Sequence, residues 1–119
     1  MKKVAFDCKG TLMNRPADHK VVKLFKWFES KGCEMYIWSS LYSYAKETRT
    51  EHGFDCEIRE KFSNTKFKFE DDMPLDDYMD IAVDDDCNSD YLAAHEFIFV
   101  SDIPEDSNQF EAKFGHLLK

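Results

Sequence analysis

The sequence lacks the features typical of secreted, membrane-embedded or zinc-stapled small proteins. It has four cysteines, but they form no C-x-x-C pair, and no histidine stands at zinc-finger spacing from them. No apolar run approaches the roughly 20 residues of a membrane span. The run that follows the N-terminal lysines, residues 4–6, is far too short for a signal peptide. We therefore expect reduced thiols and a cytoplasmic protein without membrane association.

Positive charge is also scarce. The chain has 16 lysines and arginines against 24 acidic residues, which gives a formal net charge of -8. Such a field repels a nucleic-acid backbone and attracts cations, so we do not expect a nucleic-acid partner. The acidic residues are densest between Glu70 and Asp90. Most of them fit a solvated surface, but the run that begins at Asp84 follows an apolar strand pattern and is considered below.

The length of 119 residues suits one domain with one core. Folding at this size buries roughly two-thirds of the surface of the extended chain, so neither a disulfide nor a structural metal is required. No repeat, linker or low-complexity segment divides the sequence, and 11 phenylalanines can fill an aromatic core. We expect a single domain over residues 1–119.

Strand patterns alternate with helix patterns along the chain. Apolar runs predict strands at 3–6, 33–38, 56–59, 79–83 and 97–100. Helical spacing of apolar residues predicts helices from an N-cap at Asp18 to Gly32, over 42–52, and over 107–118. This order predicts the α/β class: a Rossmann-like, three-layer domain with a mainly parallel five-stranded sheet and helices on both faces. The interval 60–78 has no clear pattern.

Polar clusters follow three of the predicted strands, at 7–11, 39–40 and 84–86. Ligands of parallel α/β sheets bind at the carboxyl ends of the strands. A carboxylate such as Asp7 can attack phosphorus, and backbone N–H groups in the turn 9–11 can cradle phosphate oxygens. A hydroxyl at Ser39 could bind another oxygen, while Asp84 and Asp85 could hold a hard cation. Together these residues indicate phosphoryl-transfer chemistry.

The motifs that carry these clusters resemble those of the haloacid-dehalogenase superfamily of phosphohydrolases. VAFDCKGTL at 4–12 is similar to the first motif, YIWSS at 36–40 to the second, and IAVDDD at 81–86 to the fourth. The resemblance implies an aspartyl-phosphate mechanism that depends on Mg²⁺ and acts on a phosphorylated substrate.

The resemblance also implies a role for each matching position. Asp7 would be the nucleophile and a magnesium ligand, and Lys9 would give its backbone carbonyl to the metal. Asp84, with Asp85 nearby, would complete the magnesium site. The residues that would bind the phosphoryl group are Gly10, Thr11, Ser39 and the lysine of the third motif. That lysine is Lys66 or Lys68, with Lys61 a poorer candidate.

Lys9 departs from the family pattern. Phosphatases of this family have an aspartate there, which acts as general acid and then as general base. A lysine ammonium is a poor acid at neutral pH and no base while protonated, so a loss of about 100- to 10,000-fold is expected. Lys9 could instead pair with Asp7 in the cation site, or bind phosphate. Two functions therefore stay open: an attenuated phosphohydrolase or phosphotransferase, and an inactive domain that binds phosphate, metal or protein.

Two other phosphoryl-transfer arrangements fit less well. Receiver domains carry an acidic pair after the first strand and the phosphoacceptor after the third, whereas here the acidic run follows the fourth. A cysteine phosphatase loop needs five residues between cysteine and arginine, but six separate Cys8 from Arg15. Alternation along the strand also turns Cys8 away from the face that Asp7 uses.

The sequence leaves no room for the cap domain that often covers such sites. Residues 12–18 are too few for a cap, and so is the interval 39–84 once its predicted helix and strand are placed. We therefore expect an open site. An open site suits a large or macromolecular substrate, or cover by a second subunit in a homo-oligomer.

Overall fold

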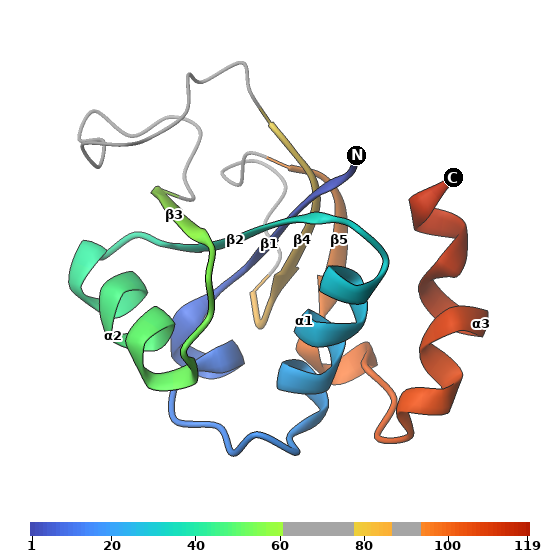
Figure 1. The fold of residues 1–119 in the computed structure, drawn as a ribbon, viewed down its shortest axis with the longest axis horizontal. Coiled ribbons are helices and arrows are strands. Elements are labelled where there is room, and N and C mark those ends of the chain that lie inside the picture. Colours follow the sequence, from blue (N-terminus) through green and yellow to red (C-terminus); the bar gives the residue numbers. More distant parts are fainter. Residues whose placement is uncertain (61–77, 87–93) are drawn as a thin grey trace.

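The computed structural model describes residues 1–60, 78–86 and 94–119. Five strands form one all-parallel sheet in the order β3-β2-β1-β4-β5 (Figure 1). The strands are β1 Lys3–Phe6, β2 Glu34–Ser39, β3 Glu57–Glu60, β4 Met79–Asp84 and β5 Ala94–Phe99. This sheet, with its helices, confirms the predicted α/β, Rossmann-like domain.

The helices of the described residues share one buried cluster with one face of the sheet (Figure 1). They are α1 Lys20–Ser30, α2 Tyr42–His52 and α3 Phe110–Phe114, the last flanked by the short turns η3 Ser107–Gln109 and η4 Gly115–Leu118. The prediction of helices on both faces is confirmed for this face. The connections 61–77 and 87–93 lie outside the described residues.

The core lies mainly between these helices and the sheet. Phe25 and Phe28 of α1 meet the ring of Phe6 edge-on, and Phe110 of α3 closes the same cluster. A smaller cluster, which includes Tyr36, Trp38 and Met79, lies on the other face of the sheet. Val4, Ala5 and Phe6 of β1 are all fully buried, so the strand has apolar residues on both faces. Such a continuous apolar run is typical of central parallel strands.

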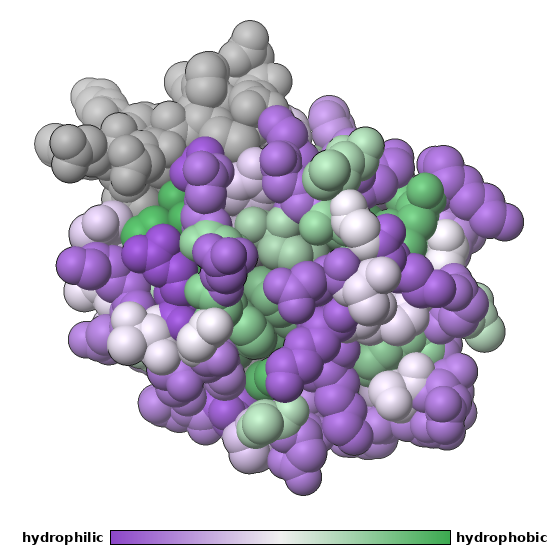
Figure 2. Space-filling view, in the orientation of Figure 1, coloured by the Kyte–Doolittle hydropathy of each residue, from purple (hydrophilic) through white to green (hydrophobic). Residues whose placement is uncertain are grey.

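The surface on the helix side is mostly polar (Figure 2). Hydrophilic residues cover most of this view, and hydrophobic residues show between them, in its middle and near its upper edge. None of the helices in the described ranges is long and apolar enough to cross a membrane.

Several element boundaries differ from those predicted. α1 begins at Lys20 rather than directly after Asp18, because the Nδ1 atom of His19 accepts a hydrogen bond from the Val21 amide at 3.1 Å and caps the helix. Burial, and then Arg15, lower the pKa of His19, which favours the neutral ring that this acceptor role requires.

The other differences are small at most strand ends and larger near the C-terminus. β2 and β3 each begin one residue later than expected, and β5 spans 94–99 rather than 97–100. The predicted helix over 107–118 is divided into η3, α3 and η4. β1 and α2 have the predicted bounds, and Gly53 ends α2 with a positive φ of 66°.

Candidate functional site

Three acidic residues meet at the carboxyl edge of the sheet. Asp7, Asp84 and Asp85 each place a carboxylate oxygen within 4.8 Å of the others. The cause is the pairing of β1 with β4, in which Phe6 lies opposite Val83. The Asp7 amide continues this ladder by donating to the Val83 carbonyl at 2.9 Å. More than 70 positions separate Asp7 from Asp84 and Asp85 in the sequence, and the sheet brings them together as predicted for adjacent strand ends.

Two of the three carboxylates are buried. Asp7 is 4% exposed and Asp84 is fully buried, whereas Asp85 is exposed. Like charges this close repel one another strongly away from bulk water, and a cation between them relieves that repulsion. Carboxylate oxygens are the ligands that hard divalent cations such as Mg²⁺ prefer, so the donor set fits the predicted metal.

Hydrogen bonds orient the two buried carboxylates. The Thr11 hydroxyl donates to Oδ2 of Asp7 at 3.4 Å, and the Asp86 amide donates to Oδ1 of Asp84 at 3.0 Å. Thr11 is itself fully buried. The structure thus brings Thr11, one of the predicted phosphate-binding residues, directly beside the predicted nucleophile.

The loop η1, Cys8–Leu12, carries the first motif away from β1. Two hydrogen bonds that each span five residues close it: from the Leu12 amide to the Asp7 carbonyl at 3.4 Å, and from the Met13 amide to the Cys8 carbonyl at 2.9 Å. Such a wide turn at the end of a strand folds the chain back over the strand end. It therefore keeps Thr11 close to Asp7.

Gly10 is the one residue of this loop with a positive φ, of 83°. A Cβ atom built there would lie 2.4 Å from Oδ2 of Asp85, well inside van der Waals contact. Gly10 therefore meets two requirements at once: a left-handed backbone and close approach of the third carboxylate.

Side chains from outside the loop hold its later carbonyl groups. Arg15 donates from Nη2 to the Gly10 carbonyl and from Nε to the Thr11 carbonyl, both at 3.3 Å. Nε2 of His52 lies 2.7 Å from the Leu12 carbonyl. Among the hydrogen bonds that fix the loop in the described residues, none uses the carbonyl of Lys9. That is the carbonyl predicted to bind the metal.

The Lys9 side chain is exposed. Pairing of Lys9 with Asp7 in the cation site stays a prediction.

Ser39 is the last residue of β2 and is 4% exposed. Its Oγ atom accepts a hydrogen bond from the Leu41 amide at 3.1 Å, just before α2 begins. The hydroxyl hydrogen can still donate to a ligand oxygen. β2 pairs directly with β1, so Ser39 lies at the same edge as Asp7. The candidates for the third-motif lysine, Lys61, Lys66 and Lys68, lie outside the described residues.

Cys8 points away from the carboxylates, as alternation predicted. It is fully buried in the cluster between sheet and helices, and its thiol donates to the Trp38 carbonyl at 3.6 Å. Cys33 and Cys56 are also free thiols. Burial raises the pKa of Cys56 to about 12, so its thiolate is disfavoured at neutral pH. Cys8 is therefore a packed thiol, as predicted.

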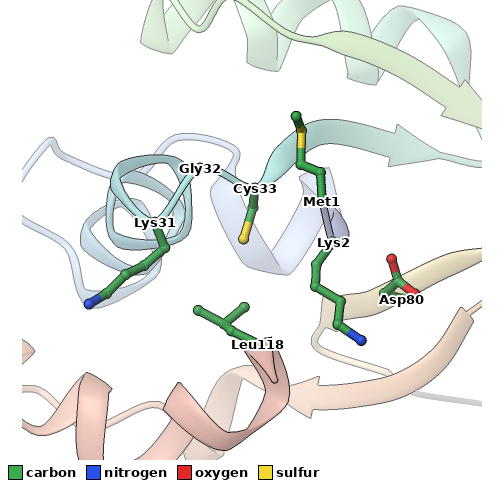
Figure 3. A pocket seen from close by; sticks show the side chains of 7 residues that line it. All are labelled: Met1, Lys2, Lys31, Gly32, Cys33, Asp80 and Leu118. Carbon is green, nitrogen blue, oxygen red and sulfur yellow. The ribbon is translucent and has the colours of Figure 1, made fainter.

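A pocket of about 380 Å³ lies at the opposite, amino edge of the sheet (Figure 3). Cys33, Lys2 and Asp80 are among its lining residues. Lys31 also lines it but forms an ion pair with Glu111, and the Asp80 carboxylate accepts a hydrogen bond from the Lys3 amide. Lys31 and Asp80 thus have partners within the fold, and the pocket is separate from the carboxylate cluster.

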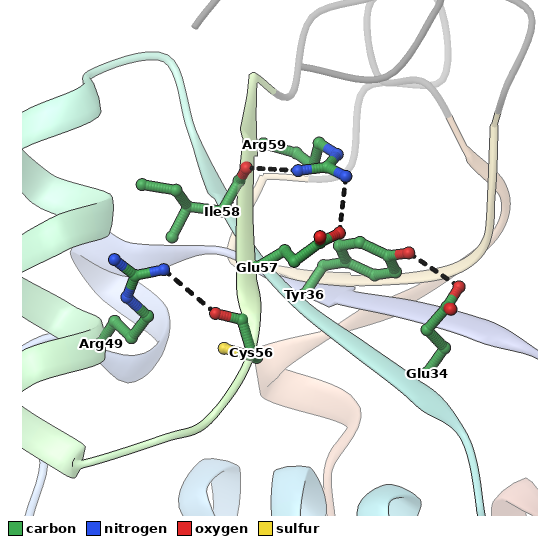
Figure 4. A network of polar contacts seen from close by, with 7 residues as sticks. All are labelled: Glu34, Tyr36, Arg49, Cys56, Glu57, Ile58 and Arg59. Carbon is green, nitrogen blue, oxygen red and sulfur yellow. Dashed lines mark hydrogen bonds and ion pairs between the residues drawn. The ribbon is translucent and has the colours of Figure 1, made fainter. Parts of the chain in front are cut away.

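A second polar network ties the edge strand β3 to β2 (Figure 4). Arg59 pairs with Glu57 at 2.6 Å and lies over the ring of Tyr36, whose hydroxyl donates to Glu34 at 2.7 Å. Burial, together with Glu34, raises the pKa of Tyr36, so its hydroxyl stays protonated. This network supports the sheet and contributes no group to the site.

Comparisons with protein-family models, with curated proteins and with solved structures gave no match. The function of this site must therefore be argued from its own residues. They are a buried carboxylate pair, a third carboxylate at the surface, and hydroxyls and backbone groups at the ends of neighbouring strands.

Proposed function

We propose that this chain is a magnesium-dependent phosphohydrolase or phosphotransferase of the haloacid-dehalogenase type that acts through Asp7. The observation that carries the proposal is the meeting of Asp7 with Asp84 and Asp85 at the carboxyl edge of the sheet. This is where parallel α/β sheets bind ligands. The placement of Thr11 beside Asp7 adds a hydroxyl at the same point.

The metal would be held by the three carboxylates and by the carbonyl of Lys9. The hydrogen bonds that close η1 use the neighbouring carbonyls and not that of Lys9, which is consistent with this role. When bound, Mg²⁺ neutralises charge on the carboxylates and on the phosphoryl group that they approach. Because the ligand from Lys9 is a backbone atom, the unusual side chain does not remove it.

In the proposed reaction an Asp7 carboxylate oxygen attacks phosphorus, and the bond from phosphorus to the leaving oxygen breaks. The leaving group takes its proton from water, since a lysine at position 9 is a poor acid. Water then attacks the aspartyl-phosphate, which releases inorganic phosphate and restores Asp7. The hydroxyls of Thr11 and Ser39 and the backbone N–H of Gly10 would bind phosphoryl oxygens, with Lys66 or Lys68 as the predicted cation.

A second candidate function is a binding module that turns over slowly or not at all. Two observations favour it: Lys9 replaces the general acid, and Asp7 is 4% exposed. Such a module would use the same carboxylates for a metal and the same hydroxyls for phosphate.

The test of the proposal is magnesium-dependent phosphate release from an aryl phosphate and from a panel of phosphorylated metabolites. We expect Asp7→Asn to reduce release to the level of buffer alone, because the amide cannot act as the nucleophile. Asp55→Asn makes the same chemical change at an exposed position before β3 and should leave the rate unchanged. Release that survives in Asp7→Asn would exclude this mechanism, and no release by the wild type would favour the binding module.

Magnesium should also stabilise the fold. A ligand that binds only the native state adds RT ln(1 + [L]/Kd), or about 2.7 kcal/mol at a hundredfold excess over Kd. We expect the melting temperature to rise in millimolar Mg²⁺ relative to EDTA. Asp84→Asn should lose most of this rise, since it removes a ligand charge.

Asparagine at position 84 keeps an oxygen that can accept from the Asp86 amide, so the variant tests the ligand charge with little change of shape. Thermal denaturation of both proteins, each in Mg²⁺ and in EDTA, measures the difference. An equal response of wild type and Asp84→Asn to Mg²⁺ would contradict the metal site.

A further inference from the structure

The end of α2 holds the loop that carries the first motif. His52, the last residue of α2, places Nε2 2.7 Å from the Leu12 carbonyl oxygen. A carbonyl oxygen can only accept, so Nε2 must carry the hydrogen. The preceding residue, Glu51, accepts a hydrogen bond from the Asn14 amide at 3.0 Å through Oε1. Two consecutive residues of α2 thus bind the backbone on both sides of Met13.

His52 is itself firmly placed. Its side chain is 6% exposed, and its ring stacks on Phe54 with centroids 5.1 Å apart. Phe54 in turn stacks on Phe25 of α1 at 3.9 Å, with the rings 8° from parallel. The imidazole is therefore a fixed donor anchored to the core rather than a mobile surface group.

The bond from His52 bears directly on Asp7. Leu12, whose carbonyl His52 holds, donates its own amide to the Asp7 carbonyl and so closes the turn that begins at the nucleophile. Thr11, the neighbour of Leu12, donates its hydroxyl to the Asp7 carboxylate. A shift of Leu12 would therefore move both groups that orient Asp7.

We infer that His52 is a positioning residue for the reaction: it fixes Leu12 and thereby the alignment of Asp7 with Thr11 and the other carboxylates. This inference rests on the proposed function. The sequence motifs did not predict this role, because His52 lies 40 residues after Leu12 in the sequence.

The test compares His52→Leu with His52→Gln. Leucine removes the donor, and a displacement of about 1 Å at a reacting group costs on the order of 100-fold in rate. We expect kcat to fall by about that factor and KM to change less, because the Ser39 hydroxyl at the end of β2 does not depend on Leu12. The glutamine amide can donate where Nε2 of His52 does, so His52→Gln should recover most of kcat. Glu47→Gln, an exposed change on the same helix, should behave as the wild type.

Two outcomes would overturn the inference: a His52→Leu variant with unchanged kcat, or a His52→Gln variant as slow as His52→Leu. The proposed function fails separately, when the wild type shows no turnover that depends on Asp7. In that case amide hydrogen exchange tests whether His52 holds the loop in place. His52→Leu should then exchange the Leu12 and Met13 amides at least about fivefold faster, with His52→Gln near the wild type. Equal exchange in all three proteins would refute the positioning role.

Discussion

Lys9→Asp should raise magnesium-dependent phosphate release by about 100- to 10,000-fold, the usual contribution of general acid–base catalysis. The substitution supplies a carboxyl group two residues after Asp7, from which a proton can pass to the leaving oxygen. The backbone at Lys9 has φ −62° and ψ 125°, an extended conformation that aspartate adopts without strain. Because the Lys9 side chain is exposed, its removal disturbs no packing.

The leaving group gives this prediction a sharper form. An aryl oxide leaves without help from an acid, whereas an alkyl oxide needs a proton as the bond breaks. We therefore expect Lys9→Asp to accelerate an alkyl phosphate more than an aryl phosphate, measured as kcat/KM for each. Lys9→Asn removes the positive charge without supplying an acid and is the matched control. If Lys9→Asp is no faster than Lys9→Asn, the proton-transfer argument is wrong.

The variant also separates the two candidate functions. A large gain would mean that the carboxylates, hydroxyls and loop already form a working site that lacks only an acid. No turnover by the wild type or by Lys9→Asp, in proteins that still bind Mg²⁺, would mean that the site binds without catalysis, as the alternative function requires. The burial of Asp7 makes this comparison informative, because a substrate must first reach a carboxylate that is 4% exposed.

The sequence predicted the sheet and the convergence at its carboxyl edge well, and for a simple reason. An apolar run that ends in a polar residue marks a strand end by itself, and parallel strands bring such ends to one edge. Asp7 and Asp84 follow Phe6 and Val83, which pair in the sheet, so local pattern and topology together place them side by side.

The interactions that hold η1 could not be predicted in the same way. The bond from His52 to Leu12 joins positions 40 residues apart and depends on how α2 packs on the sheet, which no local pattern encodes. The N-cap at His19 was missed because histidine is not among the preferred capping residues, and Asp18 beside it is. The close approach of Asp85 to Gly10 likewise depends on the meeting of η1 with the end of β4.

That approach leads to a second large effect: Gly10→Ala should damage the site far more than Gly32→Ala. Both glycines have φ of 83°, so each substitution costs about 1–2 kcal/mol for a side chain in the left-handed region. They differ in what a new Cβ atom would meet. At Gly32 nothing lies within 4 Å, whereas at Gly10 the Cβ atom would lie 2.4 Å from Oδ2 and 2.8 Å from Cγ of Asp85.

Asp85 is exposed and can swing aside, so we expect Gly10→Ala to fold, with a loss of stability close to that of Gly32→Ala. The displaced carboxylate, however, would leave the cluster that it forms with Asp7 and Asp84. Loss of the groups that orient metal ligands commonly costs about 10- to 100-fold in metal affinity or activity. We expect Gly10→Ala to lose about that much in magnesium affinity and in kcat. Gly32→Ala should keep both. Magnesium titration by calorimetry, urea unfolding and phosphate release on the two variants measure the three quantities. Equal losses in the two variants would mean that the backbone conformation alone matters at Gly10, and that Asp85 does not belong to the metal site.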